Sequence, residues 1–202
     1  MIRKIPDKSY TFSDYFKLNC EPLDIANHFG YKLEKIQFST TIQIKPLPQE
    51  IEQNVGDLKH KLIKRLKGYY FSAEIAKRGV YVDPVIALLY DWLEFKVLIE
   101  YSIEVNDRLK GTLDYLITTE DKKIAVIEAK KDDLEKGFSQ LIPEMIALRE
   151  DNEQDIFGVV TTGSSWQFGK LNQNTIYQDI DLYSCPGQLR QIVTIFAAFL
   201  TQ

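Results

Sequence analysis

Three consecutive strand-like segments beginning at Lys96 constrain the fold more than any other part of the chain. Residues 96–105, 109–118 and 123–130 are rich in β-branched and aromatic residues, and TEDK forms a turn between the last two. An amphipathic helix is predicted over 132–149, and a short apolar strand follows it. A meander of strands between helices predicts a mixed β-sheet covered by helices, an α/β architecture.

The sequence on either side of this block predicts further elements. These are helices at 57–67, 72–78, 85–93 and 186–200 and a hairpin over 166–183. Ser72 is the expected N-cap of the second of these helices, and Gly79 is expected to end it. We expect residues 54–202 to form the core domain.

The first fifty residues have a less regular pattern. A short helix is predicted in PLDIANHFGY, with Pro22 near its start and Gly30 just past its end. Residues 35–44 alternate between apolar and polar and predict a half-exposed strand. Residues 45–50 contain two prolines and predict an extended connector. We therefore expect an N-terminal α+β extension or small subdomain over residues 1–53.

Composition places the chain among ordinary globular proteins. It has 202 residues, of which 45% are hydrophobic, and its net charge is −4. This charge does not indicate a nucleic-acid binder, so a nucleic-acid function must rest on local chemistry. No apolar run approaches about 18 residues, which argues against a membrane span. The N-terminus lacks the apolar region of a secretory signal. Cys20 and Cys185 lie far apart, and we expect reduced thiols in a cytoplasmic protein.

Two carboxylates and a lysine interrupt the apolar pattern of the second and third strands. Period two places Glu128 and Lys130 on one face of a strand otherwise made of Ile, Val and Ala. A hairpin with an odd-length loop would set Asp114 directly opposite Glu128, with Cβ atoms about 5 Å apart. Such like charges repel, and Mg²⁺ between them would remove the repulsion because it prefers oxygen ligands. Lys130 would then lie beside a metal-bound water, which it can orient or deprotonate.

The alternative is an edge strand on which Glu128 and Lys130 face solvent, and the tripeptide EAK alone favours it. However, the apolar run before Glu128 indicates a central strand. Asp114 on the neighbouring strand adds a second carboxylate. The combination favours a functional site.

These residues resemble a known family. The segments GTLDYLI, IAVIEAKKD and FSQLIPEM are similar to the PD-(D/E)xK nuclease superfamily, which has the restriction-endonuclease-like fold. Within it, the chain resembles stand-alone relatives of the N-terminal nuclease domain of type I restriction-enzyme R subunits. The resemblance runs from about Phe71 to the C-terminus and includes VVTTGSSWQFGKLN.

The resemblance implies roles for individual residues. Asp114, Glu128 and the backbone carbonyl of Ala129 would bind Mg²⁺, with Mn²⁺ as a substitute, and Lys130 would be the catalytic lysine. Glu74 occupies the place of the acidic residue that such nucleases carry on the first core helix, where it touches the metal or its water. Gln140 matches the glutamine of the helix motif QxxxY.

The sequence departs from the family pattern at two positions. Leu113 stands where the family name expects proline, which is a common variation. Glu144 stands where the tyrosine of QxxxY would be, which puts the DNA-contacting role of this helix in doubt. Lys136, Gln140 and Glu144 form one polar stripe at i, i+4 and i+8, which is either a solvated face or part of the site. Pro143 is expected to kink the helix.

The expected function is a Mg²⁺-dependent nuclease that hydrolyses phosphodiester bonds with a metal-activated water. DNA is the expected substrate by family analogy, in restriction, defence or DNA repair. Residues 57–78 are locally basic and either position DNA or form an ordinary solvated helix face. A homodimer and restriction-system partner subunits are the other expected partners. The alternatives are a catalytically weak nucleic-acid-binding module of the same fold and a hydrolase of phosphate metabolites.

Overall fold

The computed structural model describes residues 4–71, 77–120, 123–128, 133–150 and 155–201, and for residues 125–128 it describes the backbone. The helices are α1 (Phe12–Lys17), α2 (Pro22–His28), α3 (Phe38–Thr41), α4 (Gln49–Leu66), the π-helix η1 (Arg78–Val82), α6 (Asp83–Trp92), α7 (Leu134–Leu148) and α8 (Leu189–Thr201). The strands are β1 (Lys32–Ile36), β2 (Lys96–Asn106), β3 (Leu109–Thr118), β4 (Lys123–Glu128), β5 (Ile156–Thr161), β6 (Ser165–Asn172), β7 (Thr175–Asp179) and β8 (Tyr183–Ser184).

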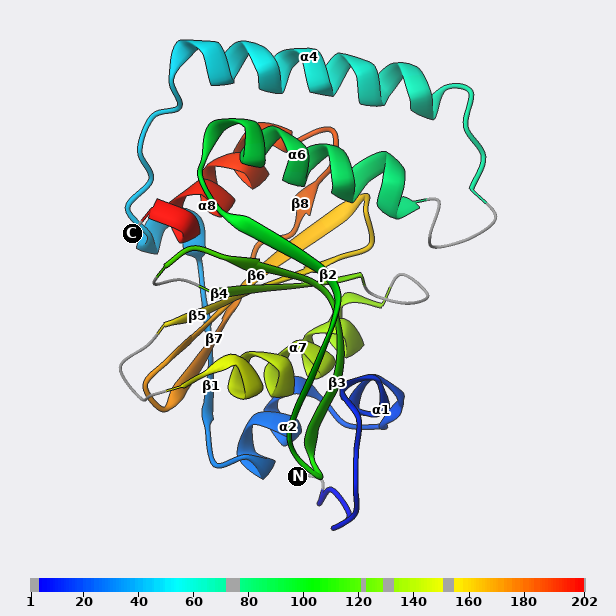
Figure 1. Cartoon of the computed structure of the whole chain (residues 1–202), viewed down its shortest axis with the longest axis vertical. Helices are drawn as coiled ribbons and strands as arrows, with labels where there is room; N and C mark the ends of the chain where they lie inside the picture. The colour runs from blue at the N-terminus through cyan, green and yellow to red at the C-terminus, as the bar shows by residue number, and fades with distance from the viewer. Residues whose placement is uncertain (1–3, 72–76, 121–122, 129–132, 151–154, 202) are drawn as a thin grey trace.

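The eight strands form one open mixed sheet (Figure 1). Its order is β1-β7-β6-β5-β4-β3-β2, and β8 pairs with β6. The strands β2, β3 and β4 form the predicted antiparallel meander, and β5 returns parallel to β4 after α7. The predicted α/β architecture, a mixed sheet flanked by helices, is confirmed.

Helices cover both faces of the sheet. Figure 1 shows α4, α6 and α8 on one side and α1, α2 and α7 on the other. Each side has its own hydrophobic cluster, one containing Leu62, Leu89 and Phe196 and the other Phe12 and Phe138. Burial of these two apolar layers supplies the main driving force for folding.

The sheet-facing side of α7 was predicted correctly. Phe138, Leu141, Ile142 and Met145 are fully buried, as their helical spacing indicates. The helix lies very close to β5, because a Cβ atom at Gly158 would lie 2.7 Å from the Leu141 side chain. Glycine is therefore required on this strand for the helix to pack.

The predicted strand over residues 35–44 is wrong. β1 ends at Ile36, and residues 38–41 form the short helix α3 instead. The Asp179 carboxylate accepts a hydrogen bond from the Phe38 amide at 3.2 Å, and the Thr40 hydroxyl donates to the Gln37 carbonyl at 3.0 Å. Such side-chain bonds satisfy the backbone locally and compete with strand pairing.

The N-terminal residues are joined to the sheet and to its α7 face. β1 pairs with β7 in parallel, and the side chains of α1 and α2 belong to the same cluster as those of α7. The expected boundary at residue 53 lies inside α4, which begins directly after Pro48.

The predicted end of a helix at Gly79 is also wrong. Gly79 lies inside η1, which continues directly into α6 at Asp83. Pro84 lies in the first turn of α6, directly after η1. Ser72, the predicted N-cap, lies outside the described residues.

No helix in the described part of the chain combines the length and the apolar character needed to cross a membrane.

Candidate active site

Asp114 lies where the β2–β3 ribbon is distorted. Its neighbours Leu113 and Tyr115 pair with Tyr101 and Ile99, and Glu100 between these two has a φ of 53°. Leu113 packs in the α7-side cluster, whereas Tyr115 packs in the cluster on the α6 side. Regular alternation would put both on one face, so the ribbon turns at Asp114. A left-handed residue in a strand carries strain of the kind that concentrates at functional sites.

Arg78 holds the Asp114 carboxylate. One guanidinium nitrogen donates to Asp114 Oδ1 at 2.8 Å, and another donates to Glu100 Oε1 at 2.9 Å. The Arg78 side chain is 18% exposed and lies over the Tyr115 ring, 5.4 Å from its centroid. The Tyr115 hydroxyl in turn donates to Asp83 on α6. Arg78 thus connects η1 to the turn of the ribbon.

The direct pairing predicted for Asp114 and Glu128 is wrong by one residue. The β3–β4 ladder pairs Tyr115 with Val126, and the same register carried one step further would bring Asp114 opposite Ile127. A one-residue difference in register exchanges the faces of a regular strand. The turn of the ribbon at Asp114 interrupts that regularity, so alternation alone does not fix the face of its side chain.

Glu128 lies on a central strand, as predicted. β4 lies between β3 and β5, and Glu128 is paired with Thr161 of β5. The side chain of Glu128 is not described. Glu74, Ala129 and Lys130 lie outside the described residues.

Gln140 and Glu144 form a buried hydrogen-bonded pair on α7. The Gln140 amide donates to Glu144 Oε1 at 2.9 Å. Gln140 is 7% exposed and Glu144 is 0% exposed, so the solvated-face alternative is excluded for both. The Oε2 atom of Glu144 is buried and has no hydrogen-bond partner among the residues that the structure describes. Pro143, which was expected to kink the helix, lies buried inside α7.

The electrostatics of this pair link it to Asp114. Burial raises the pKa of Glu144 well above its ordinary value, the Gln140 hydrogen bond lowers it, and the negative charge of Asp114 raises it further. The Asp114 charge therefore acts on Glu144 across the α7–β3 interface. Of the predicted site residues, Asp114 forms an ion pair with Arg78, which was not predicted, and Gln140 bonds Glu144, which was left open as a solvated face or part of the site.

Sequence reasoning missed Arg78 and the burial of Glu144. Arg78 appeared only as one of several basic residues, and its neighbours in the sequence gave no sign of an ion pair with Asp114. For Glu144, the available sign was the run of apolar residues on both sides of it in α7.

No cluster of three or more histidine, cysteine, aspartate or glutamate side chains able to hold a metal ion occurs within the described residues. Of the predicted metal ligands, Asp114 lies in the described part of the chain. Glu74 and the side chain of Glu128 lie outside it. The described oxygen donors at the site are Asp114 and Glu144, and carboxylates of this kind suit a hard divalent cation.

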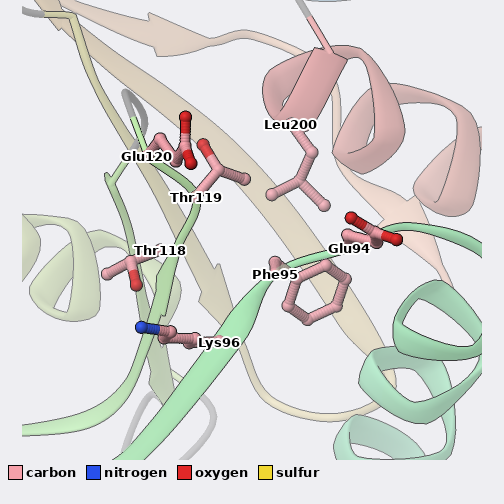
Figure 2. Close-up of a pocket in the computed structure, with 7 residues that line it drawn as sticks. All are labelled: Glu94, Phe95, Lys96, Thr118, Thr119, Glu120 and Leu200. Carbon is pink, nitrogen blue, oxygen red and sulfur yellow. The ribbon is translucent and has the colours of Figure 1, made fainter.

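A separate pocket lies at the far end of β2 and β3 (Figure 2). Its lining residues are Glu94, Phe95, Lys96, Thr118, Thr119, Glu120 and Leu200. Lys96 and Thr118 are paired, and Thr118 is four positions along β3 from Asp114, roughly 13 Å at strand spacing. The pocket is therefore distinct from the Asp114 site.

Comparison with known proteins gives one distant relative. No family model matches the chain. Crinkler effector protein 5 from Phytophthora infestans is 24% identical over 124 residues, which cover 58% of this chain. The chain spans about a third of the length of that relative, with 35% of it covered. This likeness does not assign the chain to a family.

Proposed function

We propose that the protein is a metal-dependent nuclease of restriction-endonuclease-like fold, with its active site at Asp114. The observation that carries the proposal is the position of Asp114 at the turn of β3, on the strand next to the one that contains Glu128. Its negative charge also raises the pKa of the buried Glu144 carboxyl. Arg78 compensates part of the Asp114 charge, and a bound divalent cation would compensate the remaining carboxylates of the site.

The order of elements supports the proposed fold. The β2–β3–β4 meander, α7 and the parallel strand β5 contain GTLDYLI, IAVIE and FSQLIPEM, and VVTTGSSWQFGKLN runs from β5 through β6. The strand that contains Glu128 and the helix that carries FSQLIPEM are consecutive elements of the described chain. Gln140, the glutamine of the helix motif, donates a hydrogen bond to Glu144. The negative charge of Asp114 raises the pKa of Glu144.

The residues that would hold Mg²⁺ or Mn²⁺ are Asp114, Glu128, the Ala129 carbonyl and Glu74. The oxygen Oε2 of Glu144 fits a cation here, because it is a hard donor that has no hydrogen-bond partner among the described residues. A bound divalent cation would lower the pKa of its water and neutralise charge on the phosphate.

The remaining residues of the site hold its charged groups in place. Arg78 keeps the Asp114 carboxylate in place, and Tyr115 keeps Arg78 in place through its ring face. Lys130 is proposed to orient the attacking water or to stabilise the phosphate, as its place after Glu128 implies.

DNA is the proposed substrate, and the basic end of α4 supports it. Lys61, Lys64, Arg65 and Lys67 are exposed, and none of them forms an ion pair with another described residue. An unpaired group of cations in an acidic chain attracts the phosphate backbone and adds a salt-dependent contribution to binding.

A second copy of the chain is the proposed partner, at the outer strand β2. This strand exposes Leu98, Ile99, Tyr101 and Val105, and in the described sheet it pairs with β3 alone. A long apolar edge strand is a template for pairing with another strand. Sedimentation equilibrium should give a dimer that Ile99→Lys weakens, whereas a monomer at all concentrations would refute the pairing.

The runner-up function is a nucleic-acid-binding module that has lost useful catalysis. The ion pair of Arg78 with Asp114 favours it, because the guanidinium is bonded to Oδ1 of Asp114, an oxygen that a metal ion would otherwise coordinate. Restriction-system subunits would then be the partners that supply cleavage.

A cleavage assay separates these functions. Plasmid and linear DNA are incubated with Mg²⁺ or Mn²⁺ and wild type, Asp114→Ala or Lys130→Ala, with Lys32→Ala as the matched surface control. The nuclease proposal predicts cleavage by wild type and the control and loss in both site variants. Cleavage that persists in both site variants would refute the site, and metal-independent DNA binding without cleavage would support the binding module.

A further inference from the structure

The oxygen Oε2 of Glu144 is buried and has no hydrogen-bond partner in the described part of the chain. Glu144 is fully buried on α7, and the other carboxyl oxygen, Oε1, is held by the Gln140 amide at 2.9 Å. A buried polar atom left unpaired costs about 1–3 kcal/mol. Groups of this kind in folded proteins call for an explanation, and an absent ion is one of the usual ones.

The Gln140 bond gives the carboxyl of Glu144 a defined orientation. Both residues lie on the same face of α7, four positions apart, so the bond joins successive turns of one rigid helix. With Oε1 engaged, the second oxygen is the one left to act on another group. The described ionised group close enough to affect Glu144 is Asp114 of β3.

The surroundings of Glu144 would suit an apolar residue better than an acid. Its neighbours in α7 include Leu141, Met145 and Leu148, which pack in the hydrophobic cluster. Burying a polar group without its full set of hydrogen bonds costs free energy that an apolar side chain of similar size does not cost. A carboxyl at this position is therefore a cost to the cation-free fold, and that cost is offset if a cation uses the free oxygen.

We propose that Glu144 is a direct ligand of the divalent cation at the Asp114 site, through Oε2. The inference rests on the proposed metal-dependent function and extends it. The helix α7 would contribute a metal ligand of its own, in addition to those of β3 and β4. Gln140 is then a positioning residue, because it acts on the cation through Glu144.

Titration calorimetry with Mg²⁺ and Mn²⁺ tests this ligand directly. The full chain is freed of metal with EDTA and dialysed, and the variants are Glu144→Gln, Asp114→Asn and the exposed control Glu34→Gln. Glu144→Gln keeps the shape of the side chain and an acceptor for Gln140. We expect it to weaken cation affinity about tenfold or more, as Asp114→Asn does, while Glu34→Gln binds like wild type.

Each other outcome has a definite meaning. If Glu144→Gln binds cations like wild type while Asp114→Asn does not, the Glu144 ligand is refuted and the nuclease site stands. If wild type binds no divalent cation, the proposed function itself fails. Thermal melting in EDTA shows whether Glu144→Gln is folded. If it is not, Glu144→Asp, which withdraws the carboxyl by one methylene, must show the same loss of affinity for the inference to survive.

Discussion

Replacing Glu144 by glutamine should stabilise the metal-free protein increasingly as the pH rises. The amide has nearly the shape of the carboxyl and keeps an oxygen for the Gln140 donor. In place of the unpartnered Oε2 it presents an NH₂ group, which is attracted rather than repelled by the charge of Asp114. The substitution therefore removes an ionisable group from a fully buried position without opening a cavity.

The magnitude follows from proton linkage. The pKa of Glu144 is raised in the folded state from the ordinary value of 4.5. Below pH 4.5 the carboxyl is protonated in both states, so it contributes no pH dependence. Between this value and the raised pKa the unfolded chain has lost the proton and the folded chain keeps it. The free energy of unfolding of wild type then falls by about 1.4 kcal/mol per pH unit relative to Glu144→Gln.

Urea denaturation followed by circular dichroism, with EDTA present, measures this difference from pH 4.5 to pH 8. For a chain of this size each kcal/mol corresponds to about 2–4 °C in Tm, so thermal melting also resolves it. Burial raises the pKa of Asp179 as well, but this group is present in both proteins and cancels in the difference. A difference between the two proteins that stays constant with pH would refute the reasoning.

Two further predictions concern packing and DNA binding. Gly158→Ala places a methyl group within 3 Å of the Leu141 side chain of α7, and urea denaturation should show that the free energy of unfolding falls by about 1–3 kcal/mol. An unchanged free energy of unfolding would mean that α7 moves away freely. The double variant Lys64→Gln/Lys67→Gln should weaken DNA binding in a fluorescence anisotropy titration and lower the salt dependence of binding by about two phosphate contacts. The control Lys32→Gln/Lys35→Gln on β1 should leave both unchanged. Equal effects of the two double variants would show that the α4 end has no special role.

Local patterns predicted the central strands well because their pairing partners are close in the sequence. The strand over 109–118 has the observed bounds, and the meander and the amphipathic helix after it were also correct. The strand over 35–44 failed because Asp179, far away in the sequence, bonds the Phe38 amide and favours a short helix. No pattern within residues 35–44 contains that information.

The site was predicted at the level of residue types and less well in its geometry. The predicted pairing set Asp114 opposite Glu128, but the register of β3 with β4 differs from it by one residue, and Glu100 adopts a left-handed conformation where the ribbon turns. The polar stripe on α7 looked equally like a solvated face, and the packing of the sheet decided that Glu144 is buried. Tertiary contacts, rather than spacing, also selected Arg78 as the partner of Asp114.

Crystals grown with Mn²⁺ and measured for anomalous scattering would test the central proposal most directly. The account predicts a Mn²⁺ peak in contact with the carboxylates of both Asp114 and Glu128, which is lost in crystals of Asp114→Asn. Peaks confined to other surfaces, or a Mn²⁺ site that survives Asp114→Asn, would contradict the assignment of Asp114 as the centre of a metal-dependent active site.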